Sequence, residues 1–106
     1  LKPGPRPLSA RFVDRDRTTL HVKFDGVNES LSPKRDVRGF WAKKDTIDLA
    51  IETQEVSPDD PNVVVVTFVD PVPHLSEMWY GLGTNPVVNL TDKADLAVPA
   101  FGPVTI

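Results

Sequence analysis

The sequence has no cysteine among its 106 residues. Disulfide bonds, cysteine nucleophiles and cysteine-ligated zinc are therefore excluded. No apolar run approaches the roughly 18 residues that a membrane-spanning helix needs, so we expect no membrane insertion. The net charge of -3 argues against a nucleic-acid partner. The two histidines are isolated from each other, and neither has a carboxylate at the spacing of a metal ligand. We therefore expect neither a metal site nor a cofactor.

The length of the chain and the positions of its prolines limit the possible domain organisation. A chain of 106 residues is one domain, long enough to bury a core without metals or disulfides. Its 11 prolines fall mainly between the apolar runs, as in strands joined by stiff turns. Residues 1–7, L-K-P-G-P-R-P, contain three prolines and are predicted to be a linker, with the domain spanning residues 8–106. Because residue 1 is Leu, we expect a piece of a longer protein.

Alternating apolar and polar residues predict strands throughout the chain. The clearest case is 19–24, where Leu20, Val22 and Phe24 share one face. The run 63–69 is almost entirely β-branched, as in a central strand. Further strands are expected at 8–12, 37–43, 46–52 and 77–82. About seven short strands and no helical period predict an all-β, two-sheet β-sandwich, either immunoglobulin-like or jelly-roll-like.

The C-terminal tail is expected to close over these sheets. Asn85 and Pro86 form a turn-favouring pair after the 77–82 strand. Asn89 and Asn85 are predicted to hold the tail through side-chain to backbone hydrogen bonds. Leu90 and Phe101 are predicted to anchor it by packing on the surface beneath.

The charge run 14–17, D-R-D-R, allows two interpretations. It could be a solvated hairpin tip or a calcium loop. Calcium loops use more oxygen ligands and usually a glycine, as in D-x-D-x-D-G, so the hairpin tip is favoured.

The polar residues do not form a recognisable catalytic motif. None of the five serines lies in a glycine-flanked elbow of the G-x-S-x-G type. Asp70 precedes His74 by four residues, with Ser76 close by, but nearness along a loop does not make a hydrogen-bonded dyad. His21 lies on the polar face of a strand. We therefore assign no catalytic residue to this chain.

Three aromatic residues are candidates for carbohydrate binding: Trp41, Trp79 and Tyr80. If Trp41 and Trp79 share an outer sheet face, they could form a platform on which sugar rings stack. The alternative is that these side chains cover apolar surface beneath the tail or pack against another domain.

Several ordered motifs together resemble the C-terminal region of the sialate O-acetylesterase-like family of carbohydrate esterases. The resemblance covers roughly residues 18–106. Its most specific part is Tyr80 followed by the N-P-V-V-N-L segment at 85–90. The weaker parts are L-H-V-K-F at 20–24, the loop 25–31, R-G-F at 38–40 and P-A-F at 99–101.

The resemblance implies a function for the chain as a whole. In this family the hydrolytic serine and its partners lie in a separate upstream α/β domain. The chain is then a non-catalytic accessory β-sandwich that packs against the hydrolase domain of the same polypeptide, in a secreted or periplasmic protein. The alternatives are a carbohydrate-binding module and a cell-surface interaction domain.

Overall fold

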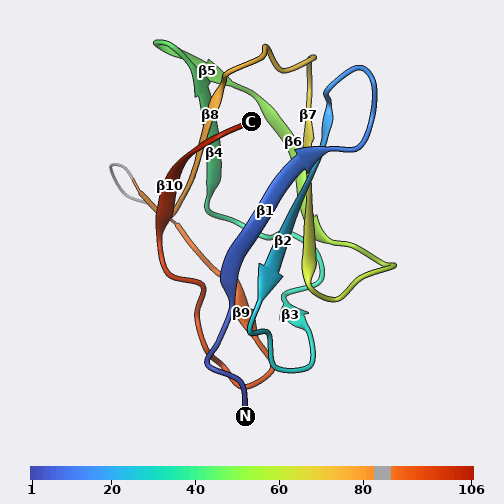
Figure 1. Cartoon of the computed structure of the whole chain (residues 1–106), viewed down its shortest axis with the longest axis vertical. Coiled ribbons are helices and arrows are strands. Elements are labelled where there is room, and N and C mark those ends of the chain that lie inside the picture. Colours follow the sequence, from blue (N-terminus) through green and yellow to red (C-terminus); the bar gives the residue numbers. More distant parts are fainter. Residues whose placement is uncertain (83–86) are drawn as a thin grey trace.

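A computed structural model describes residues 1–82 and 87–106, and these form an all-β sandwich (Figure 1). The predicted fold class is confirmed. The first sheet has the order β1 (Arg6–Phe12), β2 (Thr19–Asp25), β7 (Val63–Phe68) and β6 (Ile51–Val56). The second has the order β10 (Phe101–Thr105), β8 (Glu77–Tyr80), β4 (Phe40–Lys44) and β5 (Ile47–Leu49). A short pair joins β3 (Leu31–Ser32) and β9 (Thr91–Asp92).

The strand order is that of an immunoglobulin-like sandwich. Strands β1, β2, β7 and β6 take the places A, B, E and D, and β5, β4, β8 and β10 take the places C′, C, F and G. All pairs between neighbouring strands are antiparallel. Of the two predicted sandwich types, the topology therefore matches the immunoglobulin-like one.

The core lies between the two sheets, where period-2 patterns place the apolar side chains. On the first sheet, Leu20 pairs with Val66 and Val22 pairs with Val64, and all four are buried. On the second sheet, the buried side chains come from alternate positions of β4 and β8: Phe40, Ala42, Met78 and Tyr80. One buried face on each sheet thus forms a single core.

The predicted strand 46–52 is in fact two strands in different sheets. β5 pairs with β4 in the second sheet, whereas β6 pairs with β7 in the first. The chain crosses between the sheets at Ala50, whose carbonyl accepts from Val69 N–H at 3.1 Å. The pattern stays alternating across this crossing, so it gave no sign of the break. Ile47 of β5 is exposed, whereas Leu49 and Ile51, on either side of the crossing, pack against the core.

The predicted linker at residues 1–7 is also corrected by the structure. Strand β1 begins at Arg6, and both Gly4 and Pro5 are buried. Gly4 N–H donates to the Gly26 carbonyl at 3.0 Å, and Lys2 N–H donates to Asn28 Oδ1 at 2.6 Å. Gly4 and Pro5 are therefore packed against the sandwich, and Arg6 and Pro7 belong to its first strand.

The charge run after β1 is a turn held by its own first residue. The Asp14 carboxylate accepts from the N–H groups of Thr18 and Thr19 and from the Thr18 hydroxyl. The Thr18 side chain, followed by these backbone donors, holds the pKa of Asp14 below its ordinary value. Both oxygens of the Asp14 carboxylate accept hydrogen bonds from residues of the turn itself. This arrangement agrees with a hairpin tip.

Candidate functional site

The predicted tail anchor Asn89 makes two side-chain to backbone hydrogen bonds. Its Oδ1 accepts from Arg38 N–H at 2.7 Å, and its Nδ2 donates to the Asp36 carbonyl at 2.9 Å. The segment it holds is fixed on the other side as well, because Val37 N–H donates to the carbonyl of Gln54 in β6 at 2.9 Å. Asn89 thus joins the tail to the connection between the two sheets. The predicted anchors Asn85 and Pro86 lie outside the described residues.

The predicted anchors Leu90 and Phe101 both contact Tyr80. Leu90 is buried, and its N–H donates to Tyr80 Oη at 3.1 Å. Phe101 stacks on Tyr80 with 5.7 Å between ring centroids and meets the Phe40 ring edge-on at 6.2 Å. Tyr80 is 1% exposed. This side chain is therefore a core residue that fastens the tail, and not a surface for sugar binding as proposed from the sequence.

A buried carboxylate, missed in the sequence, ties the tail to the N-terminal segment. Asp92 is 1% exposed, and its oxygens accept from the N–H groups of Asn28, Ala94 and Leu96 and from Asn28 Nδ2. Asn28 Nδ2 also donates to the Lys2 carbonyl. Burial raises the pKa of Asp92, but these four hydrogen bonds outweigh it and leave that pKa below its ordinary value. Asp92 begins the stretch D-K-A-D at 92–95. Nothing in this stretch distinguishes a buried aspartate from an exposed one, so the sequence could not predict the burial of Asp92.

The two tryptophans lie together on the outer face of the second sheet. Trp41 of β4 and Trp79 of β8 are directly opposite each other in the antiparallel register. Their rings are stacked, with centroids 4.2 Å apart and planes 10° from parallel. Both side chains are half-buried. The condition set for a sugar platform, a shared outer face, is thus met, but the rings cover each other and do not lie side by side.

The stack is held at both sides by its neighbours. Trp41 Nε1 donates to the Leu82 carbonyl at 2.5 Å, and the Lys43 ammonium lies 5.9 Å from the Trp41 ring centroid. On the β10 side, a Cβ at Gly102 would come within 2.7 Å of Trp79 Cδ1. A glycine is therefore needed there for β10 to pass this close to the indole, and its φ of 124° also favours glycine.

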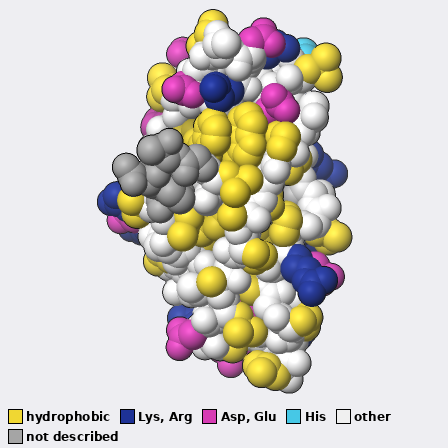
Figure 2. All heavy atoms as spheres, turned by 90° about the vertical axis from the view of Figure 1, so that its left-hand side faces the viewer, with side chains coloured by type: hydrophobic (Ala, Val, Ile, Leu, Met, Phe, Trp, Pro, Cys, Tyr) yellow, Lys and Arg dark blue, Asp and Glu magenta, His cyan; other side chains and the backbone are white. Residues whose placement is uncertain are grey.

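Further apolar side chains lie exposed in the chain that follows β8. Leu82 is 39% exposed, Val87 65% and Val88 48%. Figure 2 views the side of the molecule where β10, β8 and β4 lie in Figure 1, and hydrophobic side chains gather there. We call Trp41, Trp79 and Leu82 the tryptophan face.

The outer face of the first sheet has a different character. Its central cross-strand row is Arg11, His21, Val65 and Glu55. Lys23 follows His21 on the same face and is exposed. This row of the first sheet is thus mainly charged or polar, whereas the two stacked indoles lie on the outer face of the second sheet.

The serine and histidine considered as a dyad are not placed for nucleophilic catalysis. Ser76 is fully buried, and its hydroxyl donates to the Pro73 carbonyl at 2.7 Å. His74 is exposed, as is Asp70. A nucleophilic serine needs its hydroxyl directed at a base, whereas this one is directed at a backbone carbonyl.

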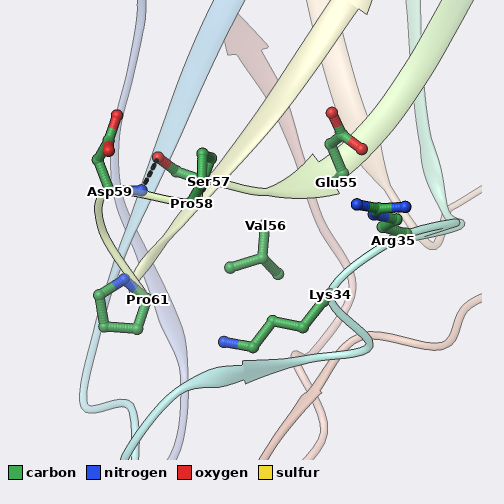
Figure 3. A pocket seen from close by; sticks show the side chains of 8 residues that line it. All are labelled: Lys34, Arg35, Glu55, Val56, Ser57, Pro58, Asp59 and Pro61. Carbon is green, nitrogen blue, oxygen red and sulfur yellow. Dashed lines mark hydrogen bonds between the residues drawn. The ribbon is translucent and has the colours of Figure 1, made fainter.

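A shallow depression lies at the end of the sandwich where β6 turns toward β7 (Figure 3). Its volume is about 400 Å³. Val56 forms its floor, Lys34 and Arg35 lie on one side, and Glu55 and Asp59 contribute carboxylates. Charges of both signs surround an open surface here, and nothing selects one class of ligand.

Among residues 1–82 and 87–106, no group of three or more histidine, aspartate or glutamate side chains is placed to hold a metal ion. Within the same ranges, no helix long and apolar enough to cross a membrane is found.

Comparison with known proteins gave no relative: no family model, no curated protein and no solved structure matches the chain.

Proposed function

We propose that the chain is a non-catalytic accessory domain of a larger carbohydrate-esterase-like hydrolase. Its role is to pack against the hydrolase domain and to stabilise or shape it. The proposal rests on the motif resemblance and on one structural observation, the place that the resembling residues take in the fold.

Several of the residues that carry the resemblance come together and hold the tail against the sandwich. Tyr80 accepts from Leu90 N–H, and Phe101 stacks on Tyr80. Asn89 holds the connection before β4, and Phe40 contacts both aromatic rings, 4.9 Å from Tyr80 and 6.2 Å from Phe101 between centroids. All of these roles are in packing or in hydrogen bonding to backbone.

This pattern supports a scaffold and not a reaction centre. In an enzyme site, the characteristic side chains converge on a space where a substrate atom can lie. Here Tyr80, Leu90 and Phe40 converge on one another in the core and are buried. The motif residues therefore hold the tail in place and stabilise the fold, which is the role expected in an accessory β-sandwich.

An activity assay tests the proposal directly. The purified chain is incubated with p-nitrophenyl acetate and with O-acetylated sialic acid, and acetate release is followed. We expect release no faster than in buffer. Hydrolysis that is lost in Ser76→Ala or His74→Ala, with the fold retained by circular dichroism, would refute the proposal.

The coding sequence before Leu1 offers a second test. A hydrolase domain with a glycine-flanked serine there supports the accessory role. Tandem β-domains in its place would favour a surface interaction protein.

A further inference from the structure

We propose that the tryptophan face is the surface through which this domain docks onto a neighbouring protein domain of the same polypeptide. The inference rests on the proposed accessory role and adds the location of the contact and the chemistry of the partner surface.

The contrast between the two outer faces locates the contact. Large aromatic side chains at the centre of a surface patch are the usual anchors of protein interfaces. Trp41 and Trp79 form such a centre on the second sheet, with Leu82 beside them. The corresponding row of the first sheet carries Arg11, His21, Val65 and Glu55, of which only Val65 is apolar.

The geometry of the indoles favours a protein over a sugar. Sugar binding by stacking uses a flat, open aromatic face. One face of Trp41 and one face of Trp79 are already covered by the other ring. The Trp41 N–H, which could bind a hydroxyl, is already donated to Leu82. What the pair still offers is apolar bulk in a fixed position, which suits packing against aliphatic side chains.

The charges beside the stack define the partner further. Lys43 lies two residues from Trp41 on the same face and is opposite Asp48 on one side and Glu77 on the other. This row has two carboxylates to one ammonium group, so it is negative overall. A complementary partner surface has aliphatic side chains opposite the indoles and a lysine or arginine opposite Asp48 or Glu77.

Footprinting tests the docking. The chain alone and the longer polypeptide that contains it are oxidised with N-bromosuccinimide, and the modification rates of Trp41 and Trp79 are measured by peptide mass spectrometry. We expect the rates to be several-fold lower in the longer polypeptide. Acetylation of Lys23, on the opposite face, serves as the control and is expected to be equal in both.

Charge reversal provides the matched variants. Glu77→Lys should raise the oxidation rates in the longer polypeptide toward those of the isolated chain, because it places like charges together. Glu55→Lys, on the outer face of the first sheet, should leave them unchanged. Neither substitution touches the core, so both variants are expected to fold.

The outcomes separate the alternatives. Equal oxidation of the tryptophans in the two forms overturns the docking proposal while leaving the accessory role intact. Protection in the isolated chain together with a dimer in light scattering assigns the face to a second copy. Protection by added O-acetylated polysaccharide assigns it to sugar, and either result overturns the proposal. A coding sequence with no further domain overturns both this proposal and the accessory role.

Discussion

A buried hydrogen bond joins Tyr80 to the backbone of Leu90, across the boundary between strand β8 and the tail. Burial raises the pKa of Tyr80, so its hydroxyl remains neutral at physiological pH and accepts from Leu90 N–H at 3.1 Å. Because the tail goes on from Leu90 to β9 and β10, this contact is one of those that position the edge strand of the second sheet.

Replacement of Tyr80 by Phe should destabilise the protein without disturbing its packing. The variant retains the ring that stacks on Phe101 but leaves Leu90 N–H buried and unpaired. An unsatisfied buried donor costs about 1–3 kcal/mol. Urea unfolding followed by tryptophan fluorescence gives the free energy of unfolding. An unchanged midpoint would show that water reaches this N–H or that the tail moves to repair it.

Asn89→Ala should lower the free energy of unfolding by about 1–2 kcal/mol, because it removes two side-chain to backbone hydrogen bonds at once. The bonds lost are those to Arg38 N–H and to the Asp36 carbonyl. Asn62→Ala is the matched control, since no hydrogen bond of the Asn62 side chain is recorded among the described residues. Equal melting temperatures for Asn89→Ala and the wild type would contradict the anchoring role.

The sequence was most informative where one strand has one buried face. The alternation of Leu20, Val22 and Phe24 is sufficient to place β2, because a shift of one residue would expose all three. The β-branched run at 63–69 predicted a central strand, and β7 does lie between two other strands, β2 and β6. The alternation argument failed at 46–52, because a chain that passes from one sheet to the other can keep its alternation through the crossing.

The tryptophan face could be predicted only in part. Period-2 alternation puts Trp79 and Tyr80 on opposite faces of β8, but composition does not decide which of the two faces the core. Whether Trp41 and Trp79 meet depends on the register between β4 and β8, which is set by contacts far apart in the sequence. Stacking of the rings on each other depends on that register too, so the sequence left the sugar platform open.

Removal of residues 1–5 distinguishes a packed segment from a linker. The deletion exposes the surface that buries Pro5 and removes the Gly4 to Gly26 backbone bond. We expect a loss of roughly 1–3 kcal/mol, from the hydrogen bonds of Lys2 and Gly4 and the burial of one small apolar side chain. Removal of Leu1 alone is the control, because this residue is fully exposed. A deletion variant as stable as the control would restore the linker interpretation.

Gly39→Ala should destabilise the protein through a close contact and through backbone strain. A Cβ at this position would lie 2.6 Å from Tyr80 Cε1 and 2.9 Å from Val88 Cγ1, and the φ of Gly39 is 129°. Thermal unfolding should show a clear fall in Tm. The control is Ala100→Gly, at an exposed position of the tail. Equal melting temperatures for Gly39→Ala and the wild type would mean that the tail can move away from β4 at little cost.

The stability of the protein should fall in acid partly because of Asp92. Its pKa in the folded state is lowered, whereas an unfolded aspartate titrates near about 3.9. A carboxyl group with a lowered folded pKa stabilises the fold above the unfolded pKa, and this stabilisation is lost as pH falls through the folded value. Unfolding by urea should therefore become easier as pH falls below about 4.

Asp92→Asn isolates this contribution from that of the other carboxylates. The amide of the variant directs donors at the N–H groups of Asn28, Ala94 or Leu96, so the variant should be less stable than the wild type at pH 7. As pH falls, the wild type loses the contribution of Asp92 and the difference between the two proteins should narrow. Asp14→Asn allows the same comparison at the other aspartate with a lowered pKa. A difference between wild type and Asp92→Asn that stays constant from pH 7 to acid would show that the ionised form of Asp92 is not what the hydrogen bonds stabilise.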